Sequence, residues 1–201
     1  MSSIAPAATV LIVPGLRDEV PEHWQTHLAR RLAASRTVPP MGRDNLACAM
    51  RVDALETEAA AIRGPIVVVA HSAGVLTVVH WAQRTRRAVH GALLAVPPDF
   101  EVGLPRGYPL PEELQAAGWL PLPRSPLPFP SIVAASRNDP LASFACVVEL
   151  AHAWGSRLVD LGCVGHLNPA SGFGEWHGAL PLIAELDPAM PAEVTIAAHV
   201  H

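Results

Sequence analysis

Short apolar runs alternate with longer amphipathic stretches along this chain. The run from Ile66 to Ala70 is β-branched and wholly apolar, as expected of a strand buried on both faces of a parallel sheet. Apolar positions at helical spacing follow most of these runs. The pattern predicts strands near residues 9–13, 37–38, 66–70, 89–96, 131–135 and 157–161, and helices near 21–34, 53–63, after 72, and near 111–117, 144–154 and 174–186.

Strands that alternate with helices in this way form a parallel sheet that is covered by helices on both faces. In such sheets, the side chains that carry chemistry collect at the carboxyl ends of the strands. A chain of 201 residues is ordinarily one domain. We therefore expect a single α/β domain over residues 1–188, followed by a frayed tail over residues 189–201, which show no core pattern.

The pattern breaks between residues 99 and 130, where eight prolines interrupt any long element. A loop of this length inside a compact domain is more often functional than idle. Two interpretations stay open, namely a wall of a substrate pocket and a plain surface crossover. Of the five tryptophans, Trp119 is the best candidate for a substrate contact because it lies in this segment.

Composition excludes several classes of function. The formal net charge of −4 leaves no basic face to neutralise a phosphate backbone, so nucleic acid is not an expected partner. Every basic residue is arginine, which excludes Schiff-base and Ser-Lys mechanisms. Cys48, Cys146 and Cys163 are odd in number and lack paired spacing, so neither a disulfide framework nor a zinc site is indicated.

The apolar runs also bear on location. None is long enough to cross a membrane. The first 13 residues lack the positive start of a signal peptide, and their apolar run breaks at Pro14. We expect a cytoplasmic protein with no membrane partner; a protein partner is not identifiable from the sequence.

The stretch Ala70-His71-Ser72-Ala73-Gly74 joins the central apolar run to a helical pattern. A serine at the tip of such a strand-to-helix elbow needs small residues two positions before and two positions after it, because the two backbones pack closely there. Gly74 meets this need, and Ala70 stands where the usual motif has glycine. Ser72 is therefore a candidate nucleophile.

A serine nucleophile needs a base to accept its proton and a third group to orient that base. Asp139 and His166 each lie in a loop that directly follows a predicted strand. Their order along the chain, serine then aspartate then histidine, is that of an α/β-hydrolase. We interpret Ser72, Asp139 and His166 as a catalytic triad.

Other residues compete for these roles. Asp99 follows the predicted strand that ends at residue 96, and Asp160 precedes His166 closely, but Asp160 falls inside a predicted strand. His71 neighbours the serine yet points to the opposite side of an extended strand, so we interpret it as a packed, hydrogen-bonded residue. Cys163 lies near His166 without the sequence context of an activated cysteine.

Several motifs together resemble a known family. They are residues 10–16 followed by Glu22-His23-Trp24, the elbow at 70–74, and the loops at 136–140 and 165–168. In this combination they look like the small α/β-hydrolases of the YdeN and retinoblastoma-binding-protein-9 group, over nearly the whole chain. The resemblance implies an α/β-hydrolase fold with about six mostly parallel strands and helices on both faces. It also implies no metal and no organic cofactor, with the proposed triad on the family's catalytic positions.

Further site residues follow by analogy with that fold. The oxyanion formed on attack needs preorganised N–H donors, which we expect from Ala73 and from Leu16 in the loop after the first strand. Arg17 is either a ligand for a substrate carboxylate or a surface charge paired with a neighbouring acid. His23 lies near the oxyanion loop, where it either lines the pocket or sits on the surface at a helix start.

These observations predict a carboxylesterase-like serine hydrolase. It would cleave carboxyl esters, or amides, of small acyl substrates through an acyl-enzyme on Ser72. The alternative is a binding or scaffold protein that keeps the hydrolase fold with little turnover, which the substituted elbow at Ala70 favours. The complete triad argues against this alternative.

Overall fold

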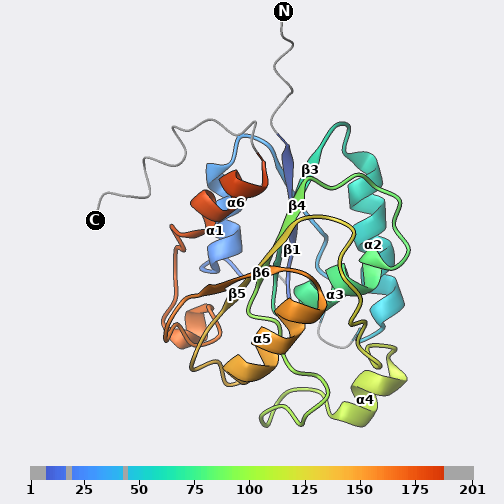
Figure 1. Ribbon diagram of the computed structural model, residues 1–201, viewed down its shortest axis with the longest axis vertical. Helices are drawn as coiled ribbons and strands as arrows, with labels where there is room; N and C mark the ends of the chain where they lie inside the picture. The colour runs from blue at the N-terminus through green and yellow to red at the C-terminus, as the bar shows by residue number, and fades with distance from the viewer. Residues whose placement is uncertain (1–7, 17–19, 43–44, 188–201) are drawn as a thin grey trace, which may run out of the picture.

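A six-stranded sheet forms the centre of the molecule. The computed structural model describes residues 8–16, 20–42 and 45–187. The strand order is β2-β1-β3-β4-β5-β6, and each strand is parallel to its neighbours, as predicted (Figure 1). The strands are β1 (Thr9–Val13), β2 (Ser35–Thr37), β3 (Ile66–His71), β4 (Gly91–Ala95), β5 (Ser131–Ala135) and β6 (Arg157–Asp160).

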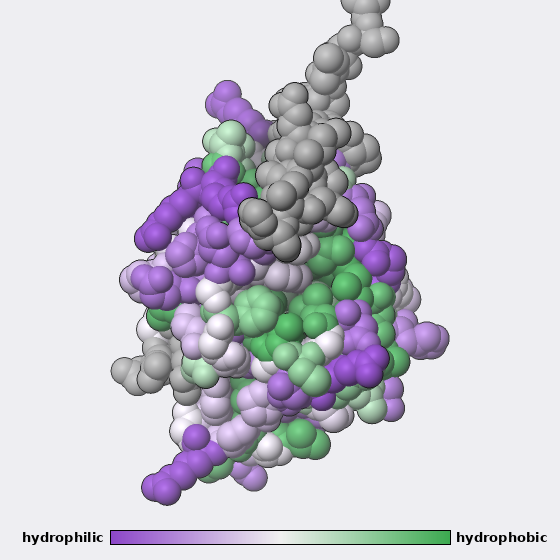
Figure 2. All heavy atoms as spheres, turned by 90° about the vertical axis from the view of Figure 1, so that its left-hand side faces the viewer, coloured by the Kyte–Doolittle hydropathy of each residue, from purple (hydrophilic) through white to green (hydrophobic). Residues whose placement is uncertain are grey.

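Helices cover both faces of this sheet. One face carries α2 (Cys48–Ala61), α3 (Ala73–Ala82) and α5 (Phe144–Ala153), and the short α4 (Pro111–Ala116) adds Leu114 to the same core. The opposite face carries α1 (Trp24–Arg31) and α6 (Ala179–Leu186). Figure 2 shows this second side, where polar side chains surround a small apolar area.

The central strand β3 contributes to both cores. Ile66, Val68 and Ala70 belong to the core beneath α2, α3 and α5, while Val67 and Val69 belong to the core beneath α1 and α6. All five residues are fully buried. Because alternate side chains point to opposite faces, a strand covered on both sides must be apolar throughout, which explains its unbroken β-branched run.

The start of α2 differs from the prediction. The sequence pattern predicts a start near residue 53, but the helix begins five residues earlier, at Cys48. The cap residue Ala47 offers no side-chain hydrogen bond; instead the Cys48 N–H donates to the carbonyl of Ala117 at 2.9 Å. Asp53 stands in the second turn of the helix, and its exposed carboxylate pairs with Arg84. A tertiary contact therefore replaces the sequence-local cap.

The last helix is also shorter than predicted. Residues 174–178 are not helical, and α6 begins at Ala179. A 3₁₀ turn, Pro169–Ser171, precedes them. The predicted tail over residues 189–201 lies outside the described residues.

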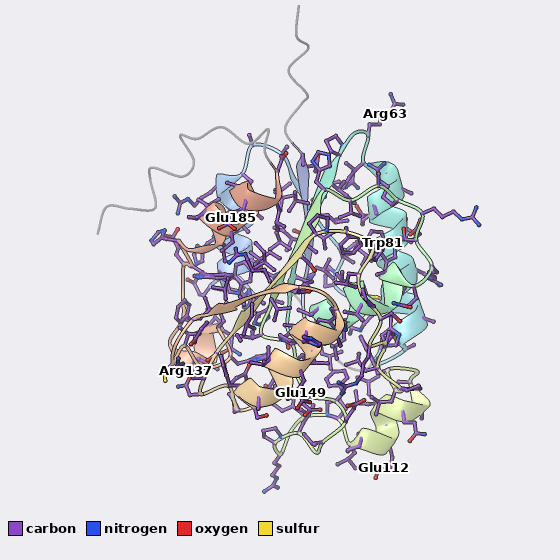
Figure 3. The ribbon with its side chains drawn as sticks, in the orientation of Figure 1. Arg63, Trp81, Glu112, Arg137, Glu149 and Glu185 are labelled. Atoms are coloured by element: carbon purple, nitrogen blue, oxygen red, sulfur yellow. The ribbon has the colours of Figure 1, made fainter. Side chains whose placement is uncertain are left out.

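Charged side chains lie at the periphery. Figure 3 shows Arg63 and Glu112 at the edge of the molecule. Trp81 is fully buried, and its indole N–H donates to Glu56. Within the described residues, no helix has the length and apolar character needed to span a membrane.

Candidate active site

Ser72 sits on a strained turn between β3 and α3. Its φ of 57° and ψ of −131° lie outside the regions that non-glycine residues ordinarily adopt. Its backbone N–H donates to the Ala95 carbonyl at the end of β4, at 3.0 Å. The strain and the fixed N–H hold the serine at the tip of the elbow, as the sequence motif predicts.

Small residues make this elbow possible. A Cβ on Gly74 would lie 2.3 Å from the carbonyl oxygen of Val13 and 2.6 Å from that of Pro14. Only glycine therefore lets α3 pack against the exit of β1. Ala70, at the position where the usual motif has glycine, is fully buried and belongs to the core beneath α2, α3 and α5. Its methyl group is accommodated there.

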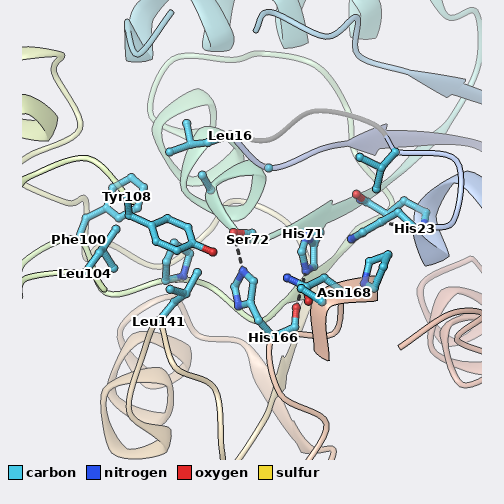
Figure 4. Close-up of a pocket in the computed structure, with 17 residues that line it drawn as sticks. Leu16, His23, His71, Ser72, Phe100, Leu104, Tyr108, Leu141, His166 and Asn168 are labelled. Carbon is cyan, nitrogen blue, oxygen red and sulfur yellow. Dashed lines mark hydrogen bonds between the residues drawn. The ribbon is translucent and has the colours of Figure 1, made fainter. Parts of the chain in front are cut away.

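The three residues of the predicted triad lie together. His166 Nε2 is 2.8 Å from Ser72 Oγ, a contact drawn in Figure 4. His166 Nδ1 is 2.8 Å from Asp139 Oδ2 and 3.0 Å from Oδ1. The side chains of His166 and Asp139 are 5% and 1% exposed. A carboxylate that faces Nδ1 keeps the proton there, so Nε2 is the nitrogen left to accept the serine proton.

The loop after β5 holds the loop that carries His166. Asn138 Oδ1 accepts a hydrogen bond from the Gly165 N–H at 2.7 Å, and Ser136 Oγ accepts one from the Val164 N–H at 3.3 Å. The His166 N–H itself donates to Ser171 Oγ at 3.0 Å. The acid and the base are therefore positioned by one connected set of hydrogen bonds.

His71 also contacts the loop that carries His166. Its Nε2 lies 3.0 Å from the His166 carbonyl oxygen, and the rings of the two histidines are 5.0 Å apart. Burial, with the neighbouring His166, lowers the pKa of His71 well below its usual value, so the ring is neutral. A neutral ring that faces a carbonyl donates from Nε2. The prediction of a packed, hydrogen-bonded residue is confirmed, although His71 also lines the cavity beside Ser72.

The competing acids make other contacts. Asp99 Oδ1 accepts a hydrogen bond from the Glu101 N–H at 3.0 Å. Asp160 forms an ion pair with Arg137, the residue labelled at the edge of the molecule in Figure 3. Arg137 holds the pKa of Asp160 below its usual value. Cys163 is exposed and free.

A cavity of about 220 Å³ opens beside Ser72. Both predicted oxyanion residues, Leu16 and Ala73, line it. A Cβ on Gly15 would lie 3.1 Å from Ser72 Cβ and 3.4 Å from Oγ. The loop after β1 therefore passes directly beside Ser72, and the missing side chain of Gly15 keeps that space open.

The three residues predicted to contact substrate have different positions in the structure. His23 lines the cavity and is 7% exposed, and burial lowers its pKa to about 4. Arg17 lies outside the described residues. The prediction for Trp119 is wrong: the residue is fully buried, does not line this cavity, and donates its indole N–H to the Leu46 carbonyl at 2.8 Å. Trp119 is a core residue, and its position in an irregular, proline-rich segment gave no indication of this.

Most residues of the cavity wall were not among the candidates that the sequence pattern indicates. Phe100, Leu104 and Tyr108 line it, so the beginning of the proline-rich segment forms part of the pocket. Leu141, two residues after Asp139, and Asn168, two residues after His166, also line it. Their closeness in sequence to Asp139 and His166 could have predicted that they line the cavity. For the proline-rich segment, the sequence carried no signal that separates pocket residues from core residues.

Gln25 was also missed. Its side-chain amide donates to the carbonyls of Val13 and Val69 at 3.2 and 3.1 Å, and it lines the cavity. These bonds join the ends of β1 and β3 next to the elbow. A single buried amide side chain at the start of a helix does not change the apolar pattern of the sequence, so these hydrogen bonds could not be predicted from it.

Comparisons with known proteins agree with this geometry. A model of the family described as serine hydrolase matches residues 10–185. No curated protein matches the chain. Among solved structures, a chain described as a YdeN-like hydrolase from Pectobacterium atrosepticum is 32% identical, with a TM-score of 0.75 over 89% of this chain and 90% of that one.

Two more distant structures share the fold. The ydeN gene product of B. subtilis is 18% identical, with a TM-score of 0.72 over 89% of this chain and 98% of that one. An esterase domain from Rhodothermus marinus is 16% identical, with a TM-score of 0.64 over 90% of this chain and 87% of that one. With the family match over most of its length, the chain belongs to the serine hydrolase family, among its YdeN-like members.

Proposed function

We propose that this serine hydrolase cleaves carboxyl esters of small acyl groups through an acyl-enzyme on Ser72. The observation that carries the proposal is the continuous chain of contacts from Asp139 through His166 to Ser72, with 2.8 Å at each step. Such a chain makes a weak hydroxyl nucleophile reactive at neutral pH.

In the first half of the reaction, Ser72 Oγ attacks the acyl carbon while His166 Nε2 takes its proton. Asp139 stabilises the imidazolium that forms. The carbonyl oxygen becomes an oxyanion and accepts hydrogen bonds from the N–H groups of Leu16 and Ala73. The bond to the alcohol oxygen then breaks, and His166 returns the proton to this leaving oxygen.

Water completes the second half. His166 removes a proton from the water, the resulting hydroxide attacks the acyl carbon, and the bond to Ser72 Oγ breaks. The serine recovers its proton from the imidazolium, and the carboxylic acid leaves. Esters are favoured over peptides because a cavity of about 220 Å³ has room for a small acyl group.

The test is turnover of p-nitrophenyl acetate by the wild-type protein and by Ser72→Ala. The wild type should release p-nitrophenol catalytically, and the variant should lose activity by a factor of about 10⁴ or more. Ser143→Ala, which removes the hydroxyl that caps α5 and does not line the cavity, is the matched control and should retain turnover. A wild type that does not turn over any small ester would contradict the proposal and favour the binding or scaffold alternative.

A further inference from the structure

The cavity beside Ser72 has two chemically different halves. Figure 4 shows Leu16, Phe100, Leu104, Tyr108 and Leu141 on one side of the Ser72–His166 pair. On the other side lie His23, His71 and Asn168. All eight residues line the same cavity, so one substrate contacts both halves. The first group is aliphatic or aromatic, and its one polar side-chain atom is the Tyr108 hydroxyl oxygen, which Figure 4 shows directed toward the Ser72–His166 pair. We call this first group the apolar half and the second group the polar half.

Part of the apolar half belongs to, or packs against, the folded core. Phe100 is 1% exposed, and its ring meets that of Trp119 edge to face at 5.5 Å. Leu141 is 4% exposed, and Leu104 packs against the core beneath α2, α3 and α5. These side chains are held by packing before any substrate arrives, so burying an apolar chain against them needs little reordering.

One hydrogen bond connects this wall to the triad. Asp139 Oδ1 accepts a hydrogen bond from the Leu141 N–H at 2.8 Å, while the same carboxylate faces His166. The apolar wall is therefore fixed relative to the reacting atoms. A chain that fills the apolar half has a defined position with respect to Ser72 Oγ.

The described lining of the cavity carries no ionised partner for a charged substrate. None of the 17 lining residues is aspartate, glutamate or arginine. The histidines of the polar half are neutral at pH 7, because burial lowers the pKa of His23 to about 4 and holds the pKa of His71 well below its usual value. Burial of a carboxylate without a partner is strongly unfavourable.

The polar half lies next to the base. Asn168, Pro169 and Ala170 come from the loop that carries His166, and all three line the cavity. The leaving oxygen must come within reach of His166 Nε2 to receive its proton. This arrangement favours the alcohol part of the ester in the polar half and leaves the apolar half for the acyl chain.

We propose that the substrates of this enzyme are esters of short, neutral, aliphatic carboxylic acids, whose acyl chain occupies the half formed by Leu16, Phe100, Leu104, Tyr108 and Leu141. The inference rests on the proposed esterase function and names its substrate class. It predicts selection by the length and the charge of the acyl group, with weak dependence on the alcohol.

The wild-type protein tests acyl length directly. Across p-nitrophenyl acetate, butyrate and hexanoate, each added methylene that is buried should raise kcat/KM about fourfold until the pocket is full. We expect butyrate to exceed acetate by about 15-fold, because it has two more methylenes, and laurate to fall below hexanoate because the cavity is small. A flat profile from acetate to hexanoate would overturn the inference.

Acyl charge is tested with p-nitrophenyl valerate and p-nitrophenyl hemisuccinate, which have similar length but differ by one carboxylate. We expect kcat/KM for the hemisuccinate to be at least about 100-fold lower. Equal turnover of the two esters would overturn the inference. If Arg17→Ala then removed only the hemisuccinate activity, the carboxylate-binding role considered for Arg17 would replace it.

A pair of variants tests the wall. Leu104→Arg places a cation in the apolar half, and it should lower the valerate rate about tenfold or more while raising the hemisuccinate rate. Leu110→Arg is the matched control, because Leu110 is 60% exposed and does not line the cavity; its profile should match the wild type. If Leu104→Arg does not fold, Leu104→Ala should weaken the preference for butyrate over acetate.

Two readouts separate this inference from the function on which it rests. Butyl acetate and methyl acetate differ in the alcohol, whereas p-nitrophenyl butyrate and p-nitrophenyl acetate differ in the acyl group. The ratio of kcat/KM values should be smaller for the first pair than for the second, and the reverse order would overturn our assignment of the two halves. Covalent labelling of Ser72 by a fluorophosphonate reports the nucleophile alone. Labelling with a flat acyl profile contradicts only the substrate class, whereas no labelling and no turnover of any ester contradict both proposals.

Discussion

The Asp139 carboxylate places both oxygens within 3.0 Å of His166 Nδ1. One of these oxygens also accepts the Leu141 N–H, so the carboxylate cannot rotate freely. This arrangement fixes one tautomer of the imidazole and directs Nε2 at Ser72. The reactivity that we propose for the serine therefore depends on a residue that does not touch the substrate.

Asp139→Asn should lower kcat by a factor on the order of 10⁴. The amide can donate to Nδ1 and so stabilises the wrong tautomer, in which Nε2 carries the proton and cannot accept another. Steady-state turnover of p-nitrophenyl acetate measures the effect, and circular dichroism checks that the variant is folded.

Asp99→Asn and Asp160→Asn are the controls for this substitution. Asp99 caps a turn and Asp160 holds an exposed ion pair with Arg137, so each variant should keep kcat within about threefold. A loss at Asp99 that equalled or exceeded the loss at Asp139 would reassign the acid.

The proximity of Ser72, Asp139 and His166 could be predicted from sequence, because the carboxyl ends of parallel strands meet at one edge of the sheet. Ser72, Asp139 and His166 each follow a predicted strand, and the structure brings them within hydrogen-bond distance. The position of Trp119 could not be predicted in this way. An indole between prolines gives no sign of whether it faces a cavity or the core, because that depends on its contacts with Phe100 and Leu46, which are distant from it in sequence.

At the scale of elements, the elbow depends on how closely α3 approaches the exit of β1. The backbone carbonyls of Val13 and Pro14 occupy the space that any side chain on Gly74 would need. Ala70 faces a different environment, because its methyl group packs in the core rather than against the turn. The two small positions of the motif are therefore unequal in this protein.

A matched pair of variants tests this difference. Gly74→Ala should destabilise the fold by about 3 kcal/mol and abolish most activity, because backbone atoms must move to admit the methyl group. Ala70→Gly should cost about 1 to 2 kcal/mol through the lost methyl contact and the added chain entropy, and it should leave turnover near the wild-type level. Urea unfolding followed by tryptophan fluorescence measures both free energies of unfolding. A larger loss at Ala70 would contradict this account of the elbow.

Strands were easier to predict than helix ends, for a physical reason. A strand buried on both faces must be apolar, so an apolar run in the sequence predicts it directly. The strand β5, for example, has the predicted bounds, Ser131–Ala135. A helix end depends on whatever satisfies its free N–H groups. In α2 this partner is the carbonyl of Ala117, which is far away in sequence. No local pattern reports such a contact.

At the scale of the whole molecule, the buried histidines couple stability to pH. The pKa of His23 falls from 6.5 to about 4 on folding, because burial disfavours its charged form. Between these values the unfolded chain binds more protons than the folded one. The contribution of His23 is therefore lost progressively as the pH falls below 6.5.

The free energy of unfolding should fall by about 2 kcal/mol between pH 7 and pH 5 through His23 alone. His23 Nδ1 also accepts the Gln25 N–H at 3.2 Å, so a proton on this nitrogen would remove the cap of α1. His23→Asn keeps a capping acceptor that does not titrate. Urea unfolding at both pH values should show a smaller loss in this variant; an equal loss would rule out His23 as a source of the pH dependence.

The central claim is that Ser72 is the nucleophile of an enzyme whose base is His166. Its most direct measurement is reaction with a fluorophosphonate, followed by peptide mapping of the phosphonylated residue by mass spectrometry. We predict one adduct, on the peptide that contains Ser72, with labelling that is at least about 1000-fold slower in His166→Ala. An adduct on another serine, or equal labelling of wild type and His166→Ala, would contradict the account.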